Sequence, residues 1–169
     1  ISEINDFYKS LSDMLGIKIN TAEYEKRAEN SIEEALKAIG DYPIAIDYQA
    51  VKKPFTLAKA LIEYGFNVGF VMTDEPKAIE KEAYDYIRET QKQIRIVNAV
   101  HPDLVKYENR DRQYLCIGFD CGYATGSEKV IDMMDDEFLF GFYGVEMLME
   151  KMIDAYHSSG NIKEMIKEA

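Results

Sequence analysis

Cysteine is scarce in this chain. Only Cys116 and Cys121 occur among the 169 residues, too few for a disulfide framework and too close in sequence to close a useful loop. Because disulfides form mainly in oxidising compartments, this composition favours a reducing, intracellular environment. We therefore expect a cytoplasmic location.

Long apolar runs, a signal peptide and the compositional marks of disorder are also missing. The segment Ile1–Asp6 has neither a basic nor an apolar signal region, and no run approaches the ~20 apolar residues of a membrane span. With 47% hydrophobic residues, four prolines and ten glycines, the composition is that of a soluble, folded domain. Since the first residue is Ile rather than Met, we expect a processed product or an excised piece of a longer chain.

Positive charge is the third deficit. Twenty lysines and arginines face 31 aspartates and glutamates, which gives a formal net charge of -11. Phosphate backbones and anionic lipids both require clustered cations, so the sequence predicts neither a nucleic-acid nor a membrane partner. A chain of this length can bury most of its apolar surface as one unit, and we expect residues 1–169 to form a single domain.

Apolar residues follow a helical period at both ends of the chain. One helix is predicted from Phe7 to Leu15, ended by Gly16, and a longer one from Thr21, its cap, to Ile39. A third is predicted from Phe142 to about His157. On that last helix, the stripe we expect to be buried consists of Val145, Leu148, Met149 and Met152.

Short apolar runs of strand length lie between these helices. The predicted strands are Pro43–Asp47, Asn67–Met72, Ile94–Val97, Tyr114–Phe119 and a weaker fifth at Lys129–Met134. Helices at Pro54–Tyr64 and after Pro76 separate the first three strands, and a short helix is predicted at His101–Tyr107. This alternation predicts an α/β, Rossmann-like doubly wound parallel sheet of four to five strands with flanking helices, in the order 3-2-1-4-5.

Chemically active side chains follow the first and fourth predicted strands. In an open parallel sheet, ligands bind beyond the carboxyl ends of the strands, where the strand order reverses. The loops Asp47–Ala50 and Asp120–Ser127 reach this point. Seven residues of these loops are candidates for a cleft. Asp47 and Asp120 are candidate proton carriers, and Cys121 is a candidate metal ligand or redox-sensitive thiol. Tyr48, Tyr123 and Thr125 are candidate positioning groups, and Gln49 is a further cleft candidate. The alternative is an ordinary turn whose glycines satisfy positive φ.

Several familiar motifs are absent. The stretch Asp47–Lys53 contains no glycine, so a pyrophosphate would have no close backbone approach there. Neither a P-loop nor a G-x-S-x-G elbow occurs. His101 opens a connector and His157 closes the last helix, so neither is well placed for a catalytic triad. The sequence therefore disfavours NAD binding, P-loop chemistry and serine hydrolysis.

Several local patterns resemble those of one family. The helix Phe7–Leu15 followed by Gly16-Ile17 is similar to a family segment that leads into a long helix. The unit from Pro43 to Thr73 is similar to the family's first βαβ unit. The stretch Leu139–Glu150, LFGFYGVEMLME, is similar to its terminal Leu-Gly-Tyr-x-Gly motif. Over nearly its whole length, the chain resembles the C-terminal domain of nitrogenase component 1-type oxidoreductases.

The resemblance implies a part in electron transfer. Members of this family combine three Rossmann-like domains, pair with a paralogous or identical subunit, and receive electrons from an ATP-dependent iron-sulfur reductase. It implies an iron-sulfur or related metal cluster in the full-length complex. Because this chain offers one plausible thiolate ligand and no well-placed histidine, we expect no cofactor and no turnover in the isolated domain. The cofactor-binding histidine of catalytic subunits would lie between Ile131 and Phe140, where this chain has none. Three functions stay open: an oxidoreductase subunit, a scaffold for metallocofactor assembly, and a small-molecule or metal-chelate binding module that shares only the fold.

Overall fold

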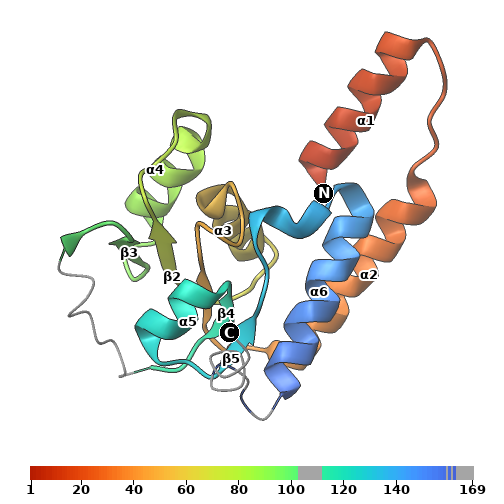
Figure 1. The fold of residues 1–169 in the computed structure, drawn as a ribbon. Helices are drawn as coiled ribbons and strands as arrows, with labels where there is room; N and C mark the ends of the chain where they lie inside the picture. Colours follow the sequence, from red (N-terminus) through yellow and green to blue (C-terminus); the bar gives the residue numbers. More distant parts are fainter. Residues whose placement is uncertain (103–111, 159, 161, 163–169) are drawn as a thin grey trace.

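The centre of the molecule is a parallel sheet of five strands in the order β3-β2-β1-β4-β5 (Figure 1). The computed structural model describes residues 1–102, 112–158, 160 and 162. The strands are β1 (Ile44–Ile46), β2 (Val68–Thr73), β3 (Arg95–Asn98), β4 (Leu115–Ile117) and β5 (Lys129–Ile131). The predicted fold class and strand order are confirmed, although β5 ends well before Met134.

Three of the strands form where the chain is apolar on both faces. Every residue of β1, β2 and β4 is buried, as expected for the interior of a parallel sheet. Ala45 of β1 lies opposite Phe70 of β2 on one side and Cys116 of β4 on the other. The edge strand β3 has only β2 beside it, and its residues are exposed or half-buried.

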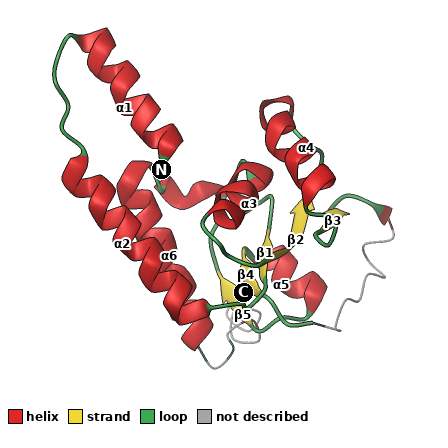
Figure 2. Cartoon of the chain, turned by 180° about the vertical axis from the view of Figure 1, so that it is seen from behind, coloured by secondary structure: helices red, strands yellow, loops and turns green. Residues whose placement is uncertain are grey.

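Helices cover both faces of the sheet (Figure 2). They are α1 (Ser2–Leu15), α2 (Ala22–Ile39), α3 (Pro54–Glu63), α4 (Lys81–Thr90), α5 (Phe119–Thr125) and α6 (Gly141–His157), with the short 3₁₀ segments η1 (Ala78–Glu80) and η3 (Asp135–Phe138). Ile44 and Ile46 pack in one apolar cluster with residues of α2, α3, α4 and α6, whereas Ala45 packs with α5 on the other face. Across the described part of the chain, every helix is too short or too polar to traverse a bilayer.

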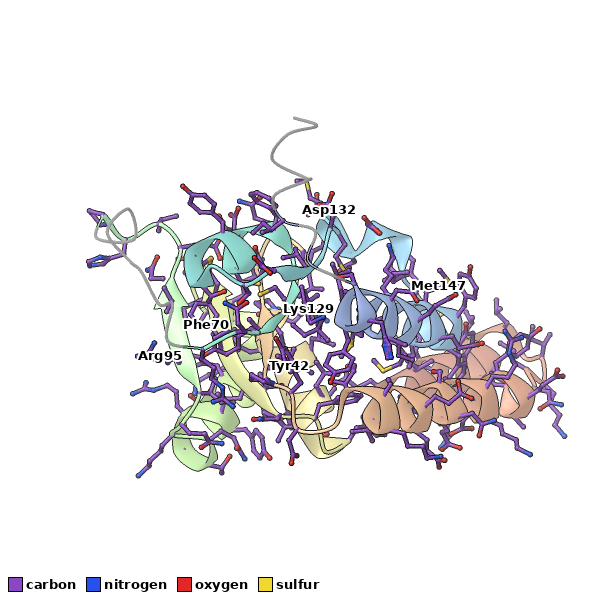
Figure 3. The ribbon with its side chains drawn as sticks, turned by 90° about the horizontal axis from the view of Figure 1, so that it is seen from below. Tyr42, Phe70, Arg95, Lys129, Asp132 and Met147 are labelled. Carbon is purple, nitrogen blue, oxygen red and sulfur yellow. The ribbon has the colours of Figure 1, made fainter. Side chains whose placement is uncertain are left out.

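The last helix, α6, lies along α2 (Figure 1). Leu148, Met149 and Met152 are buried as predicted, but Val145 is only half-buried because it lines a cleft. Lys129 lies beside the far end of α6 (Figure 3). Its ammonium group donates to the carbonyl oxygens of Tyr156 and Ser158. A cation thereby satisfies carbonyl groups that the helix end leaves without partners.

The first helix, α1, projects from the body and has no buried residue (Figure 1). It begins at Ser2, earlier than predicted, and ends at Leu15. Gly16 is the C-terminal cap, as predicted, and its φ of 63° is left-handed. Thr21 is the residue before α2, but the predicted side-chain cap is wrong because its hydroxyl makes no capping hydrogen bond.

The loop predicted after the fourth strand is instead the helix α5. Gly118, with φ of 108°, turns the chain into this helix, and Gly126, with φ of 65°, ends it. Gly122 is needed for close packing, since a Cβ there would lie 2.6 Å from Cγ2 of Val130. The glycines therefore mark helix boundaries and a tight contact rather than an open turn. A short helix is also predicted at His101–Tyr107. Positions 103–107 of this segment lie outside the described residues.

Candidate functional site

The carboxylate of Asp47 occupies the point where the strand order reverses, between the ends of β1 and β4. The residue is completely buried. Its Oδ1 accepts a hydrogen bond from the Gln49 amide at 2.8 Å, and its Oδ2 accepts one from the Cys121 amide at 3.1 Å. Since Cys121 lies in the first turn of α5, Asp47 caps this helix from a neighbouring strand end. Asp47 therefore holds the loop after β1 against α5.

Gly118 allows the two strand ends to approach this closely. Its φ of 108° and ψ of 154° fall in a region that glycine alone adopts readily. A Cβ at this position would lie 2.5 Å from the Cβ of Asp47 and 2.8 Å from the Cβ of Ala50. The reversal point is consequently filled by the chain's own side chains.

A small polar cluster extends from Asp47 toward solvent. The side-chain amide of Gln49 donates to Oδ2 of Asp120 at 2.9 Å and to the hydroxyl of Tyr48 at 3.1 Å. Tyr48 and Asp120 are half-buried, and Gln49 is exposed. The structure thus brings together Asp47, Tyr48, Gln49 and Asp120, as predicted for residues that leave adjacent strand ends.

Burial makes both carboxyls of this cluster weaker acids. It raises the pKa of Asp47 above the ordinary value, and the negative charge of Asp120 adds to this rise, while the amide hydrogen bonds of Gln49 and Cys121 oppose it. Burial likewise raises the pKa of Asp120. Of the two, only Asp120 combines this shift with access to solvent.

Cys121 does not lie at the mouth of the site, contrary to the sequence-based expectation. The first turn of α5 directs its side chain inward, where it is completely buried in the same apolar cluster as Cys116. The thiol donates to the carbonyl oxygen of Gly118 at 3.3 Å, and burial raises the pKa of Cys121 well above its ordinary value. A buried neutral thiol packs as a small apolar group and gives a metal no open approach.

Tyr123 and Thr125 are not part of the cluster either. Tyr123 is 71% exposed and stacks on Phe119, with ring centroids 6.4 Å apart. Thr125 is completely buried, donates to the carbonyl oxygen of Cys121 at 2.7 Å, and shares a 2.7 Å hydrogen bond with the hydroxyl of Ser127. The helical geometry of α5 separates these two side chains, whereas a loop would have allowed them to converge.

A left-handed turn follows β5. Asp135, Asp136 and Glu137 have φ values of 52°, 61° and 43°, although none of them is glycine. Such conformations cost roughly 1–2 kcal/mol per residue for L-amino acids. The turn is held to the loop after β1, because the amides of Asp135 and Asp136 each donate to a carbonyl oxygen of that loop at 2.8 Å. Oδ1 of Asp136 in turn accepts from the Lys52 amide at 3.1 Å.

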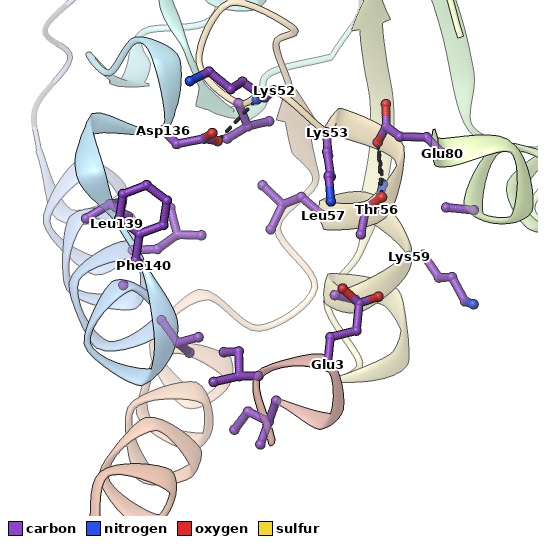
Figure 4. Close-up of a pocket in the computed structure, with 18 of the residues that line it drawn as sticks. Glu3, Lys52, Lys53, Thr56, Leu57, Lys59, Glu80, Asp136, Leu139 and Phe140 are labelled. Carbon is purple, nitrogen blue, oxygen red and sulfur yellow. Dashed lines mark hydrogen bonds between the residues drawn. The ribbon is translucent and has the colours of Figure 1, made fainter. Parts of the chain in front are cut away.

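A cleft of about 910 Å³ opens beside this turn (Figure 4). Its walls are α3 with the residues before it, the start of α6 with the turn after β5, and the first residues of α1. Apolar side chains form much of its lining, among them Val51, Leu57, Met133, Val145 and Leu148. Ile79, on the η1 side, and Phe140, at the start of α6, also line it and are 72% and 71% exposed.

Charged groups lie at the margins of the cleft (Figure 4). Lys53 lies on the α3 wall, and Glu3 enters from α1. Glu80, only 1% exposed, caps α3 from η1: its Oε1 accepts from the amide of Thr56 at 2.9 Å and from its hydroxyl at 3.2 Å. This buried carboxylate therefore belongs to the scaffold of the cleft.

Sequence reasoning missed the cleft. Its walls come from residues 1–4, 51–64, 79–83 and 133–148, and nothing in the local pattern of any one segment shows that they meet. One available signal was the pair Gly141 and Gly144. A Cβ at Gly144 would lie 2.4 Å from the carbonyl carbon of Leu139, so the start of α6 packs tightly on the turn that precedes it.

The residues of this chain do not fit the ligand set of an iron-sulfur cluster. Such clusters take about four thiolate ligands, and the chain has two cysteines, both buried. In the described ranges, no group of three or more His, Cys, Asp or Glu side chains is placed to hold a metal ion.

The five-stranded parallel sheet with helices on both faces defines an α/β, Rossmann-like fold. No protein-family model matches the chain, and no curated protein matches it. Among solved structures, it is similar to a chain of nitrogenase Cp1 at pH 6.5, with a TM-score of 0.66 and 17% sequence identity. The similarity covers 99% of this chain and 39% of the nitrogenase chain. At this identity, the likeness establishes a shared fold.

Proposed function

We propose that the chain is a Rossmann-like domain of a nitrogenase component 1-like oxidoreductase, which takes part in reductase-driven, metal-cluster-dependent electron transfer to a substrate. The observation that carries this proposal is the fold similarity over 99% of the chain to a nitrogenase chain of which it spans 39%. The segments Gly16-Ile17 and Leu139–Glu150, which carry the sequence resemblance, support it independently.

In this proposal, the chain acts in the cytoplasm with the other domains of the same subunit and with a paralogous or identical subunit. An ATP-dependent iron-sulfur reductase supplies the electrons. The full-length complex contains an iron-sulfur or related metal cluster, whose thiolate ligands come from outside residues 1–169 because Cys116 and Cys121 are buried.

Asp120 is the residue best suited to move a proton in this function. It is half-buried, burial raises its pKa, and its Oδ2 is held by the Gln49 amide at 2.9 Å. Asp47 is less suited, since both of its oxygens accept backbone amides and none of it is exposed. Gln49 and Tyr48 act as positioning residues for the Asp120 carboxyl.

The test uses the full-length polypeptide that contains this chain, purified anaerobically through an affinity tag. We expect iron and acid-labile sulfide to co-purify, and an added iron-sulfur reductase to be oxidised only when ATP is supplied. Asp120→Asn should lower this turnover without changing the iron content. Asp41→Asn, at an exposed site before β1, is the matched control and should change neither. A polypeptide without iron and without ATP-dependent reductase oxidation would overturn the proposal.

The cleft supports a second candidate function, that of a small-molecule or metal-chelate binding module. A volume of about 910 Å³ with a partly apolar lining is typical of small-molecule sites. The same purification separates the candidates. An organic molecule bound without iron favours the binding module, and iron without ATP-dependent turnover favours a scaffold for metallocofactor assembly.

A further inference from the structure

Charged groups of both signs lie at one end of the cleft. Lys52 and Lys53 share this end with Glu80 and Asp136 (Figure 4). The two carboxylates accept the backbone amides of Thr56 and Lys52, and they keep their negative charge when they do so. The formal charges of the four side chains therefore cancel, and this end selects neither an anion nor a cation.

Carboxylates outnumber lysines at the opposite end, but their charge is paired or lies in water. Lys59 donates to Glu82 at 2.8 Å and lies 4.0 Å from Glu63. The side chains of Glu82 and Glu63 are 89% and 56% exposed, and Glu3, at the start of α1, is exposed as well. Since water and salt screen exposed charges, these groups attract an ion inside the cleft only weakly.

The lining between the two ends is apolar. Leu57 lies on the α3 wall, and Leu139 and Phe140 lie on the opposite wall (Figure 4). The side chains of Ile79 and Phe140, which flank the cleft, are 72% and 71% exposed. Removing such surface from water drives binding without any charge on the ligand, because the gain depends on the apolar area covered.

We propose that this cleft binds an uncharged organic molecule with an apolar body. An ion would lose hydration on entering and would gain no buried counter-charge in return. An uncharged apolar molecule loses little hydration and covers Leu57, Ile79 and Phe140. This inference rests on the second candidate function above, that of a binding module, and it names the class of molecule bound.

The test compares fluorescent probes that share a pyrene body and differ in charge: the neutral 1-pyrenebutanol, the anion 1-pyrenebutyrate and the cation 1-pyrenebutylamine. Each is titrated into the full-length polypeptide that contains this chain, and binding is followed by pyrene fluorescence and by calorimetry. We expect saturable binding of the neutral probe, with both ions binding about threefold more weakly because they give up hydration without gaining a counter-charge.

Two pairs of variants test whether the probe lies in the cleft. Phe140→Ala should weaken binding of the neutral probe about fivefold, because it removes an apolar side chain from the wall. Tyr123→Ala is its control, since Tyr123 is also 71% exposed but lies in α5, outside the lining. Ala60→Phe, which fills the α3 wall, should weaken binding about tenfold. Ala22→Phe, at an exposed position at the start of α2, should leave it unchanged.

Failure of the ligand class and failure of the site give different results. Equal or tighter binding of the anion or the cation would overturn the assignment of an uncharged ligand and leave the binding module in place. Absence of saturable binding, or binding that Phe140→Ala and Ala60→Phe leave unchanged, would overturn the cleft as a binding site and the second candidate function with it.

Discussion

Replacing Gly118 by alanine should destabilise the chain strongly, because this position lies where β1 and β4 converge. The new Cβ would lie 2.5 Å from the Cβ of Asp47 and 2.8 Å from the Cβ of Ala50, both far inside van der Waals contact. Neither neighbour can easily move. Asp47 is held by two backbone amides at 2.8 and 3.1 Å, and Ala50 is completely buried.

The magnitude follows from two contributions. The backbone of Gly118, with φ of 108° and ψ of 154°, lies in a region that costs a non-glycine residue of order 1–3 kcal/mol. Forcing a methyl group into a packed interior costs typically about 1–3 kcal/mol more. We therefore expect the free energy of unfolding to fall by about 2–6 kcal/mol, a large fraction of the roughly 5–15 kcal/mol of a typical domain.

The measurement is urea-induced unfolding followed by circular dichroism, with Gly16→Ala as the matched control. Gly16 also has a positive φ, 63°, but a Cβ there would meet no atom within 4 Å. This control should lose only about 1 kcal/mol, from backbone strain alone. Two results would contradict the tight packing of Gly118 on Asp47 and Ala50: an equal loss of unfolding free energy in both variants, or a loss below about 1 kcal/mol in Gly118→Ala.

Four other experiments test separate parts of the structure. Leu148→Ala should lower the free energy of unfolding by about 2–5 kcal/mol in the same urea assay, because the side chain is only 9% exposed in the main core; a loss under about 1 kcal/mol would contradict its burial. Glu80→Ala should cost about 1–3 kcal/mol, since the Thr56 amide loses its acceptor, whereas Glu80→Gln keeps an acceptor oxygen and should cost less; equal losses would refute the capping role. Asp120 should contribute stability that is fully present below about pH 4, its ordinary range, and lost as the pH rises through its raised folded-state pKa. The stability advantage over Asp120→Asn should therefore shrink as the pH rises above about 4, and a urea-unfolding series across pH in which it grows or stays constant would contradict this. Iodoacetamide should label Cys121 only upon unfolding, as read by mass spectrometry, and rapid labelling of the native chain would disprove its burial.

The strands and most helices were predictable because their signals are local. Apolar runs of strand length at β1, β2 and β4 mark segments buried on both faces, and the glycine at the end of α1 marks a left-handed cap. The strand order followed from the βαβ alternation and the right-handed rule for crossovers. The helix α5 was missed because Gly122 and Gly126, so close together, have the pattern of a turn. The structure uses one of them for packing and the other to end the helix.

The candidate site was only partly predictable. Asp47, Tyr48, Gln49 and Asp120 come together because parallel strands place their carboxyl ends at one edge, a consequence that the predicted topology contains. Their roles within the cluster were not accessible in this way. That Asp47 is a buried clamp and Asp120 a half-exposed acid depends on which amides each oxygen meets.

By itself, the sequence determined the fold class, the strand order and the edge of the sheet where polar groups gather, because periodicity and chain connectivity are properties of the chain alone. Only the tertiary structure decided that Cys121 is buried, that the reversal point is filled by Asp47, and that a cleft opens between α3 and α6. The physical reason is the same for all three. Each depends on close contacts between segments far apart in the chain, and such contacts follow from packing rather than from local pattern.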